Sequence, residues 1–243
     1  MDLPQPPWNR VVLKVSGEAF ASPAADETID GAVVERIAKE IAEVRDELGT
    51  QLAVVVGGGN IWRGATGSAS GMDRANADYM GMIATVINAL ALRDSLERLG
   101  QPTRVQTAIG MSQIAEPYIR LRAVRHLEKG RVVVFAAGTG NPFFTTDTAG
   151  ALRAVEIDAQ VLLKGTHATT SGVYDADPRT NPGARRLDEV SFDDVIAKGL
   201  RAMDLTAITL CKENSLPICY FSIMEPGNLG RALRGERIGT LIH

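Results

Sequence analysis

A glycine-rich stretch, residues 138–147, has the composition of a ligand cradle. It follows the apolar run 132–137 and precedes 148–157, a run that is compatible with a helix. A strand that ends in such a loop and then opens a helix presents unpaired backbone amides and the positive end of the helix dipole, which favour phosphate. The alternative is an ordinary connecting loop whose two phenylalanines pack underneath it. The side chains and glycines that suggest the cradle are Gly138, Thr139, Gly140, Pro142, Thr145 and Thr146.

Two further turns follow apolar runs and combine glycine with a basic side chain. The first, Lys14–Glu18, begins with a lysine that can reach a phosphoryl oxygen, although a surface lysine near a turn gives the same pattern. The second, Gly57–Asn60, has three consecutive glycines and is followed by Arg63. Glycines let backbone amides approach a phosphate chain, and as a purely structural turn they would cost conformational entropy with no packing in return. Neither turn has the spacing of a dinucleotide fingerprint or a P-loop.

Acidic and aromatic residues extend this inventory. Asp78 stands at or near the start of an apolar helix, where a carboxylate either caps the helix or accepts hydrogen bonds from ribose hydroxyls. Lys164 ends the fifth apolar run, and Tyr174 beyond it either lines an adenine pocket or faces solvent. Asp147 and Asp204 are scattered acids. Phosphoryl transfer needs these groups, because its catalysis consists mainly of positioning and of neutralising oxygens.

Other chemistries lack their usual residues. His126, His167 and His243 form no cluster with Asp or Cys, and neither a GxSxG elbow nor an HExxH pair is present, so hydrolase activity is not indicated. Cys211 and Cys219 lack the CxxC spacing of a zinc site. We predict that both are buried thiols in a reducing compartment.

Composition limits the partners of the chain. Hydrophobic residues make up 45% and charged residues 23%, and the formal net charge is −3, so bulk electrostatics does not attract nucleic acid or acidic membrane. Residues 1–9 are proline-rich and lack the apolar centre of a signal peptide, and no run approaches the length of a membrane span. We expect a soluble, cytoplasmic protein with no nucleic-acid and no membrane partner.

Apolar, β-branched segments alternate with helical patterns, which is typical of βαβ units around a mainly parallel sheet. The predicted helix 31–48 has one buried stripe. Within the helix predicted over 78–99, residues 80–92 are apolar nearly all round apart from Thr85 and Asn88, which predicts burial on several sides in the core or in a subunit interface. The predicted strands are Val11–Val15, Leu52–Val56, Thr103–Thr107, Val132–Ala137, Gln160–Leu163 and Pro217–Phe221.

Several segments, in consistent order from Arg10 to Ile242, resemble the bacterial uridylate kinases of the amino-acid kinase family. The resemblance implies a three-layer α/β/α sandwich around a mainly parallel sheet, and transfer of the ATP γ-phosphate to UMP with Mg²⁺, giving ADP and UDP. It also implies a homohexamer in pyrimidine nucleotide biosynthesis, activated by GTP and inhibited by UTP. The matching segments are Lys14–Glu18, Gly57–Asn60 with Arg63, Asp78–Met82, Thr139–Asp147, Tyr174–Pro178, Met203–Ala207 and Gly235–Leu241.

The resemblance also assigns roles to individual residues. It places ATP against Lys14, Val15, Ser16, Gly17, Gly59, Arg63, Thr166, Tyr174 and Asp177. It places UMP against Gly58, Asp78, Thr139, Gly140, Asn141, Pro142, Phe143, Phe144, Thr145 and Thr146. Its catalytic residues are Lys14, Lys164, Arg63, Asp147 and Asp204, and it assigns no metal ligand to the protein because ATP carries the Mg²⁺. No general base is needed, since the acceptor phosphate, whose second pKa is about 6, is already anionic near neutrality.

The family pattern divides the chain into a tail, residues 1–9, and one domain, residues 10–243, in which 10–157 form an acceptor-nucleotide lobe and 158–243 an ATP lobe. In two places the chain departs from that pattern. Residues 167–171 replace the usual Val-Asp-Gly-Val run and make the loop about two residues longer. Residues 22–27 replace a glycine-containing segment that the family links with GTP activation. Arg104 and Arg131 either belong to an effector site or are solvated surface arginines.

Two other functions fit parts of the pattern. A kinase of the same fold that phosphorylates aspartate, glutamate or carbamate would keep the lysines, but the loop 139–147 with Asp78 suits a nucleotide better than a small acid. A nucleotide-sensing protein without catalysis would keep the glycine turns. The presence of both Lys14 and Lys164 argues against it, because binding alone does not require neutralising a group in transfer.

Overall fold

One mixed sheet runs through the computed structural model, which describes residues 8–22, 27–69, 71–167, 171–178, 180–181, 183–236 and 238–243. The strands are β1 (Arg10–Val15), β2 (Gln51–Val56), β3 (Thr103–Thr107), β4 (Glu116–Pro117), β5 (Val132–Ala136), β6 (Val161–Thr166), β7 (Glu189–Val190), β8 (Ile218–Ser222) and β9 (Thr240–Ile242). Their order across the sheet is β4-β3-β5-β2-β1-β6-β8-β9-β7. The described pairings are parallel except that of β8 with β9.

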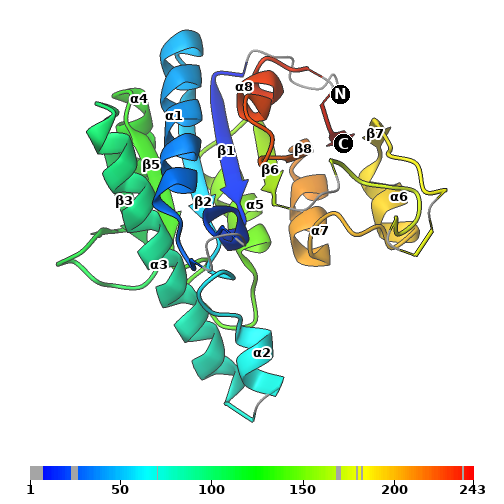
Figure 1. Ribbon diagram of the computed structural model, residues 1–243, viewed down its shortest axis with the longest axis horizontal. Coiled ribbons are helices and arrows are strands. Elements are labelled where there is room, and N and C mark those ends of the chain that lie inside the picture. The colour runs from blue at the N-terminus through cyan, green and yellow to red at the C-terminus, as the bar shows by residue number, and fades with distance from the viewer. Residues whose placement is uncertain are drawn as a thin grey trace.

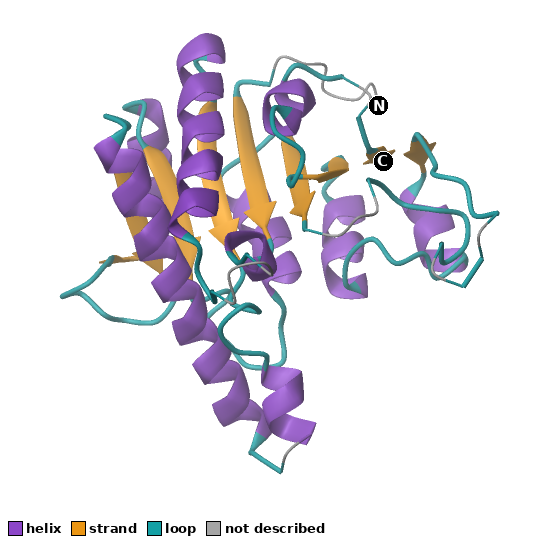
Figure 2. Ribbon diagram, viewed as in Figure 1, coloured by secondary structure: helices purple, strands orange, loops and turns teal. Residues whose placement is uncertain are grey.

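Helices cover both faces of the sheet and make a three-layer α/β/α sandwich (Figure 1, Figure 2). Buried side chains of α1, α3 and α8 share one core cluster with the sheet, and those of α4, α5, α6 and α7 share the other. The helices are the 3₁₀ helix η1 (Gly17–Phe20) and α1 (Gly31–Leu48), α2 (Gly64–Ala69), α3 (Arg74–Arg98), α4 (Arg120–Glu128), α5 (Thr146–Glu156), α6 (Phe192–Ala197), α7 (Leu205–Glu213) and α8 (Asn228–Leu233).

The central strand β1 shows why the sequence forms this sandwich. Val11, Leu13 and Val15 belong to the cluster under α1 and α3, whereas Val12 belongs to the cluster on the other face. A strand with apolar side chains on both faces is stable only between two layers of helices. The three-layer fold class expected from the sequence is therefore confirmed.

The predicted elements are confirmed wherever the apolar pattern is long. Each predicted strand is present with boundaries shifted by three residues at most, and α1 begins and ends where its buried stripe predicts. Strands β4, β7 and β9 were not predicted, because they are two or three residues long and carry no readable alternation. Helix α3 begins at Arg74, four residues earlier than predicted. The carboxylate of Asp73 caps that helix by accepting from the amide of Asn76, so a capping role for Asp78 is wrong.

The longest helix, α3, has one buried and one exposed apolar face. Met82 and Leu92 pack in the core, but Tyr79, Met80, Ile83 and Ile87 on the other side are 40–51% exposed. Burial of this helix on several sides within the core is therefore wrong, and burial in a subunit interface stays a prediction. Figure 1 shows the first half of α3 extending, with α2, beyond the edge of the sheet.

Strands β1, β2, β5 and β6 end at the same edge of the sheet, because neighbouring strands among them are parallel. The predicted phosphate-binding turns follow β1, β2 and β5, so the topology alone brings them together (Figure 2). In the part of the chain that the structure describes, no helix is long and apolar enough to cross a bilayer. The division into two lobes stays a prediction, since one continuous sheet runs through both.

Candidate active site

The three glycine-containing loops at this edge enclose a cavity of about 510 Å³. Lys14 and Asp147 lie in its wall, and Arg63, Arg74 and Asp78 add further charged groups. Both charge signs and many backbone amides therefore face one space. The remaining lining residues are Ser16, Gly17, Glu18, Gly57, Gly58, Gly59, Trp62, Gly64, Gly81, Met82, Thr85, Gly138, Thr139, Asn141, Phe144, Thr145 and Thr146.

Two buried lysines share one carboxylate behind the cavity. Lys14 and Lys164 are register partners on the neighbouring strands β1 and β6 and are only 5% and 7% exposed. Asp147, in the first turn of α5, lies between them. Its Oδ1 is 2.7 Å from Nζ of Lys14 and also accepts a hydrogen bond from Nζ of Lys164. The structure thus brings these three residues into direct contact, and their joint role in catalysis stays a prediction.

The charges in this trio do not cancel. Burial opposes ionisation of all three groups. Lys14 and Lys164 nevertheless hold the pKa of Asp147 well below its usual range, and Asp147 raises the pKa of Lys14 above its ordinary value. Burial and the positive charge of Lys14 lower the pKa of Lys164 to about 7. One carboxylate balances one ammonium, so near neutral pH Lys164 is only partly protonated, and an anion that enters the site would favour its charged form.

Helix α3 fixes both glycine turns through the two polar residues that interrupt its apolar sequence. The side-chain amide of Asn88 donates to the carbonyl of Gly57 over 2.7 Å and to Oδ1 of Asn60 over 2.8 Å. Oγ1 of Thr85 accepts from the backbone amide of Ala137 over 2.7 Å. Both side chains are almost fully buried. Their partners are the turn after β2 and the start of the loop after β5, so one helix sets the distance between the two.

The consecutive glycines are also required for packing. A Cβ atom on Gly58 would lie 2.8 Å from the carbonyl oxygen of Gly81, and one on Gly57 would lie 2.6 Å from the amide nitrogen of Gly17. Side chains at these positions would separate the turn from α3 and from the turn after β1. The expectation that this turn gains no packing is therefore wrong. Because these glycines have no side chains, the backbone of the turn itself lines the cavity.

The loop after β5 presents its phenylalanines to solvent. Phe143 and Phe144 are 68% and 51% exposed, so the alternative in which they pack beneath the loop is wrong. Phe144 lines the cavity, and the guanidinium of Arg74 lies 5.7 Å from the centre of the Phe143 ring. Phe143 adopts a φ of 73°, a left-handed conformation that a bulky side chain rarely takes. Such a loop suits contact with a planar ligand better than core packing.

Asp78 holds that strained conformation. Its Oδ2 accepts from the backbone amide of Phe143 over 2.8 Å, and both of its oxygens accept from Nε of Arg74 over 2.9 Å. The carboxylate thus joins α3 to the loop and lies in the cavity wall. Its proposed contact with a ribose stays a prediction.

Asp204 connects two helix starts. It caps α7 by accepting from the amide of Ala207, and it accepts from the hydroxyls of Thr145 and Thr148 at the start of α5. Thr145 in turn caps α5, the helix that carries Asp147. Through these bonds Asp204 helps to position the start of α5, and with it Asp147, which contacts both lysines. A direct catalytic role stays a prediction.

Several predicted site residues stand outside the cavity wall. Tyr174 forms an isolated bridge with Arg186, and Asp177 lies 4.0 Å from Arg201. Among the described residues, the predicted site members that do not line the cavity are Val15, Gly140, Pro142, Phe143, Lys164, Thr166, Tyr174, Asp177 and Asp204. Their contacts with nucleotides stay predictions.

The sequence analysis missed other lining residues. Arg74 precedes Asp78 by one helical turn, a spacing at which opposite charges pair, and Glu18 stands in the first glycine turn. Trp62 and Met82 carried no signal, because an apolar side chain in a helix or turn is as common in cores as in sites. Thr85 stood out only as a polar interruption of an apolar helix.

The two departures from the family pattern lie partly outside the described residues. Ser22 and Glu27 form an isolated antiparallel bridge, and residues 23–26 between them are not described. His167 opens the longer loop, of which 168–170 are not described, and its Nδ1 lies 3.1 Å from Oγ of Ser16. The loop therefore begins beside the turn after β1.

Comparison with known proteins agrees with this architecture. Residues 9–222 match the Amino acid kinase family. The chain belongs to that family. This amino acid kinase is 58% identical over 236 residues to Uridylate kinase PUMPKIN, chloroplastic, of Arabidopsis thaliana, a match that covers 97% of the chain and 68% of the relative.

Solved structures of bacterial enzymes are similar to this amino acid kinase over nearly their whole length. The UMP kinase from Bacillus anthracis has 39% identity and a TM-score of 0.93, with 98% of this chain and 96% of that one covered. The UMP kinase from Ureaplasma parvum has 35% identity and a TM-score of 0.90, with 96% and 98% covered. The family resemblance inferred from the sequence is confirmed.

The trio predicts proton uptake when a triphosphate binds. A phosphate group beside Lys164 should raise the pKa of this lysine above its value of about 7. At pH 8, which lies between the lysine pKa without ligand and the pKa with ligand, ATP binding should therefore protonate Lys164. At this pH the nucleotide phosphates are already ionised. Calorimetric titration with ATP and Mg²⁺ in buffers of different ionisation enthalpy should give about half to one proton taken up per site.

The matched control is Lys164→Arg, which keeps the positive charge but does not deprotonate in this range. We expect this variant to bind ATP without the proton uptake. Equal uptake by the two proteins, or none by the unmodified enzyme, would show that Lys164 is already charged in the free site.

Proposed function

We propose that this protein is a UMP kinase, which transfers the γ-phosphate of ATP to UMP and gives ADP and UDP. The observation that carries the proposal is the carboxylate of Asp147 between the buried ammonium groups of Lys14 and Lys164, at a cavity walled by glycine turns. The relatives named as uridylate or UMP kinases support the same reaction. We propose that this reaction serves pyrimidine nucleotide biosynthesis.

The reaction joins two anions, and the site is arranged to reduce their repulsion. An oxygen of the UMP phosphate attacks the γ-phosphorus, the bond to the β,γ-bridging oxygen breaks, and ADP leaves with that electron pair. Lys14 and Lys164 neutralise the oxygens of the moving group, while Asp147 keeps both ammonium groups in place. Arg63 and the amides of the glycine turns bind the remaining phosphates.

Magnesium fits this site as a partner of the nucleotide. The carboxylates in the cavity wall are each engaged by a cation: Glu18 by Arg63, Asp78 by Arg74 and Asp147 by Lys14. Mg²⁺ is commonly bound through substrate phosphates with few protein ligands. Bound in this way it would screen the charge of the triphosphate, and Asp147 and Asp204 would orient its waters.

We assign UMP to the part of the cavity between α3 and the loop 139–146. Asp78 would accept hydrogen bonds from the ribose, and Phe144 would face the nucleotide. ATP would lie against the turns after β1 and β2, with Thr166, Tyr174 and Asp177 beyond them. The exposed phenylalanines and the carboxylate of Asp78 support this assignment over a small-acid acceptor, which offers neither a ribose nor a planar base.

A homohexamer is the assembly we propose. The exposed apolar face of α3, formed by Tyr79, Met80, Ile83 and Ile87, supports a subunit contact there, because such a face on a monomer marks an interaction surface. A cytoplasmic location stays a prediction, since the plant relative is named as chloroplastic.

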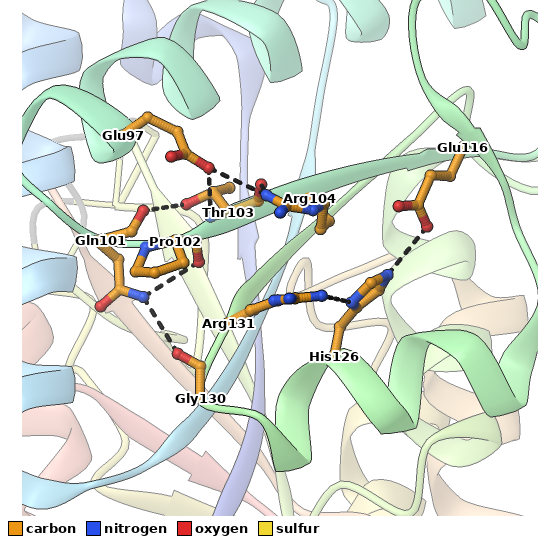
Figure 3. A network of polar contacts seen from close by, with 9 residues as sticks. All are labelled: Glu97, Gln101, Pro102, Thr103, Arg104, Glu116, His126, Gly130 and Arg131. Atoms are coloured by element: carbon orange, nitrogen blue, oxygen red, sulfur yellow. Dashed lines mark hydrogen bonds and ion pairs between the residues drawn. The ribbon is translucent and has the colours of Figure 1, made fainter.

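We also propose GTP as an activator and UTP as an inhibitor. A second cavity of about 650 Å³, lined by Arg93, Arg104 and Glu116 among others, supports an effector site. Figure 3 shows the side chain of Arg131 directed at His126 and that of His126 directed at Glu116, with each contact 3.0 Å long. Arg104 pairs with Glu97 but lines the second cavity, whereas Arg131 does not line it, so Arg104 is the better effector candidate.

The proposed activity is tested by a screen of phosphoryl acceptors. Purified enzyme with ATP and Mg²⁺ should convert UMP to UDP, measured by chromatography, faster than it phosphorylates other nucleoside monophosphates. The screen is repeated with and without GTP. Turnover of aspartate, glutamate or carbamate with none of UMP would make the protein a different kinase of this fold, and nucleotide binding without any turnover would make it a sensor.

Asp78→Ala tests the acceptor side of the site. Loss of a charged hydrogen-bond acceptor should raise the KM for UMP by about tenfold or more, and change the KM for ATP less than about twofold. Asp73→Ala, which removes the cap of the same helix, is the matched control and should change neither constant. Equal increases in both constants for Asp78→Ala would argue against a ribose contact.

A further inference from the structure

Another ion pair, in addition to that of Arg74 with Asp78, faces the cavity. Glu18, in η1, binds the guanidinium of Arg63, and the side chains are 23% and 58% exposed. Nε of Arg63 also donates to the carbonyl of Gly59 over 3.3 Å. Both charged side chains line the cavity. The guanidinium of Arg63 is thus engaged by an anionic side chain of the protein itself.

The carboxylate of Glu18 lies directly over the turn after β2. A Cβ atom placed on Gly59 would be 2.4 Å from Oε1 of Glu18, so the space above this glycine is filled by the carboxylate. This is the turn whose backbone is expected to receive phosphate. The carboxylate of Glu18 therefore lies between a guanidinium and a glycine turn, which is the environment that phosphate prefers.

We propose that Glu18 is a built-in substitute for a phosphate group, which holds Arg63 and covers Gly59 until a polyphosphate displaces it. Binding then exchanges one anion for another at Arg63. The bound state also keeps Glu18 near the incoming phosphates, and like charges repel. Glu18 accordingly weakens polyphosphate binding and acts as a positioning residue for Arg63.

The opposite role for Glu18 would be that of a ligand for the metal of the nucleotide. Its engagement with Arg63 favours displacement, because a carboxylate bound to a guanidinium must break that contact before it can bind a cation. The two roles predict effects of opposite sign. Removing the charge strengthens polyphosphate binding if Glu18 competes with phosphate, and weakens it if Glu18 holds Mg²⁺.

Calorimetric titration of Glu18→Gln with inorganic tripolyphosphate and with ATP, both in Mg²⁺, provides the test. The pair is partly exposed to solvent, so we expect Kd to fall about threefold to fivefold for both ligands. Glu43→Gln, an exposed substitution on α1 with the same change in charge, is the control and should leave Kd unchanged. In an Arg63→Met background, the gain from Glu18→Gln should shrink to less than about twofold, because most of it comes from releasing Arg63.

An unchanged or higher Kd for Glu18→Gln would overturn the proposal, and so would the full gain persisting without Arg63. If Glu18→Gln does not fold, Glu18→Asp gives the same test, because its shorter side chain reaches Arg63 less well and should also tighten tripolyphosphate binding. The inference relies on the proposed function only for the identity of the nucleotide. Tripolyphosphate binding can bear it out even if the unmodified enzyme makes no UDP.

Discussion

Two lysines and one aspartate, buried at the end of neighbouring strands, impose the main constraint on this structure. Removing two ammonium groups from water is costly, and a single carboxylate compensates only one of them. The remaining positive charge makes the site a receptor for anions. The parallel pairing of β1 with β6 places the lysines side by side, and the start of α5 places Asp147 between them.

The positions of the surrounding loops depend on α3. Thr85 and Asn88 bind the loop after β5 and the turn after β2, and Asp78 binds the amide of Phe143 further along the first of these loops. An entirely apolar helix would pack against the sheet equally well but would leave the loops without these anchors. The helix therefore contributes one apolar face to the core and a row of polar groups to the site, while its outer apolar face remains exposed.

Much of the fold and part of the site could be predicted from the sequence. The periodicity of apolar residues predicts the long strands and the single buried stripe of α1. Glycine turns beside lysines indicate phosphate binding, because few other functions need that combination. Topology then brings those turns together. The short edge strands β4 and β7 escape prediction, since two residues have no period.

Long-range contacts escaped prediction for a different reason. The bond between Asp78 and the amide of Phe143 joins residues 65 positions apart, and the bond between Thr85 and Ala137 joins residues 52 apart. Local sequence shows neither pairing. The packing role of Gly58 likewise depends on how closely α3 approaches the turn. Two of these residues nevertheless stand out in the sequence: Thr85 is polar in an otherwise apolar helix, and Gly58 belongs to a run of three glycines.

We propose that Lys14 stabilises charge on the moving phosphoryl group. The most direct measurement compares kcat and the nucleotide Kd values of Lys14→Met with those of the unmodified enzyme, with Lys39→Met on the exposed side of α1 as the control. The variant leaves Lys164 and Asp147 as a balanced pair, so it should remain folded. We expect kcat to fall by about a thousandfold, the effect of losing one group that stabilises transition-state charge, while each Kd changes less than about tenfold. A kcat within about tenfold of the unmodified enzyme would contradict this account.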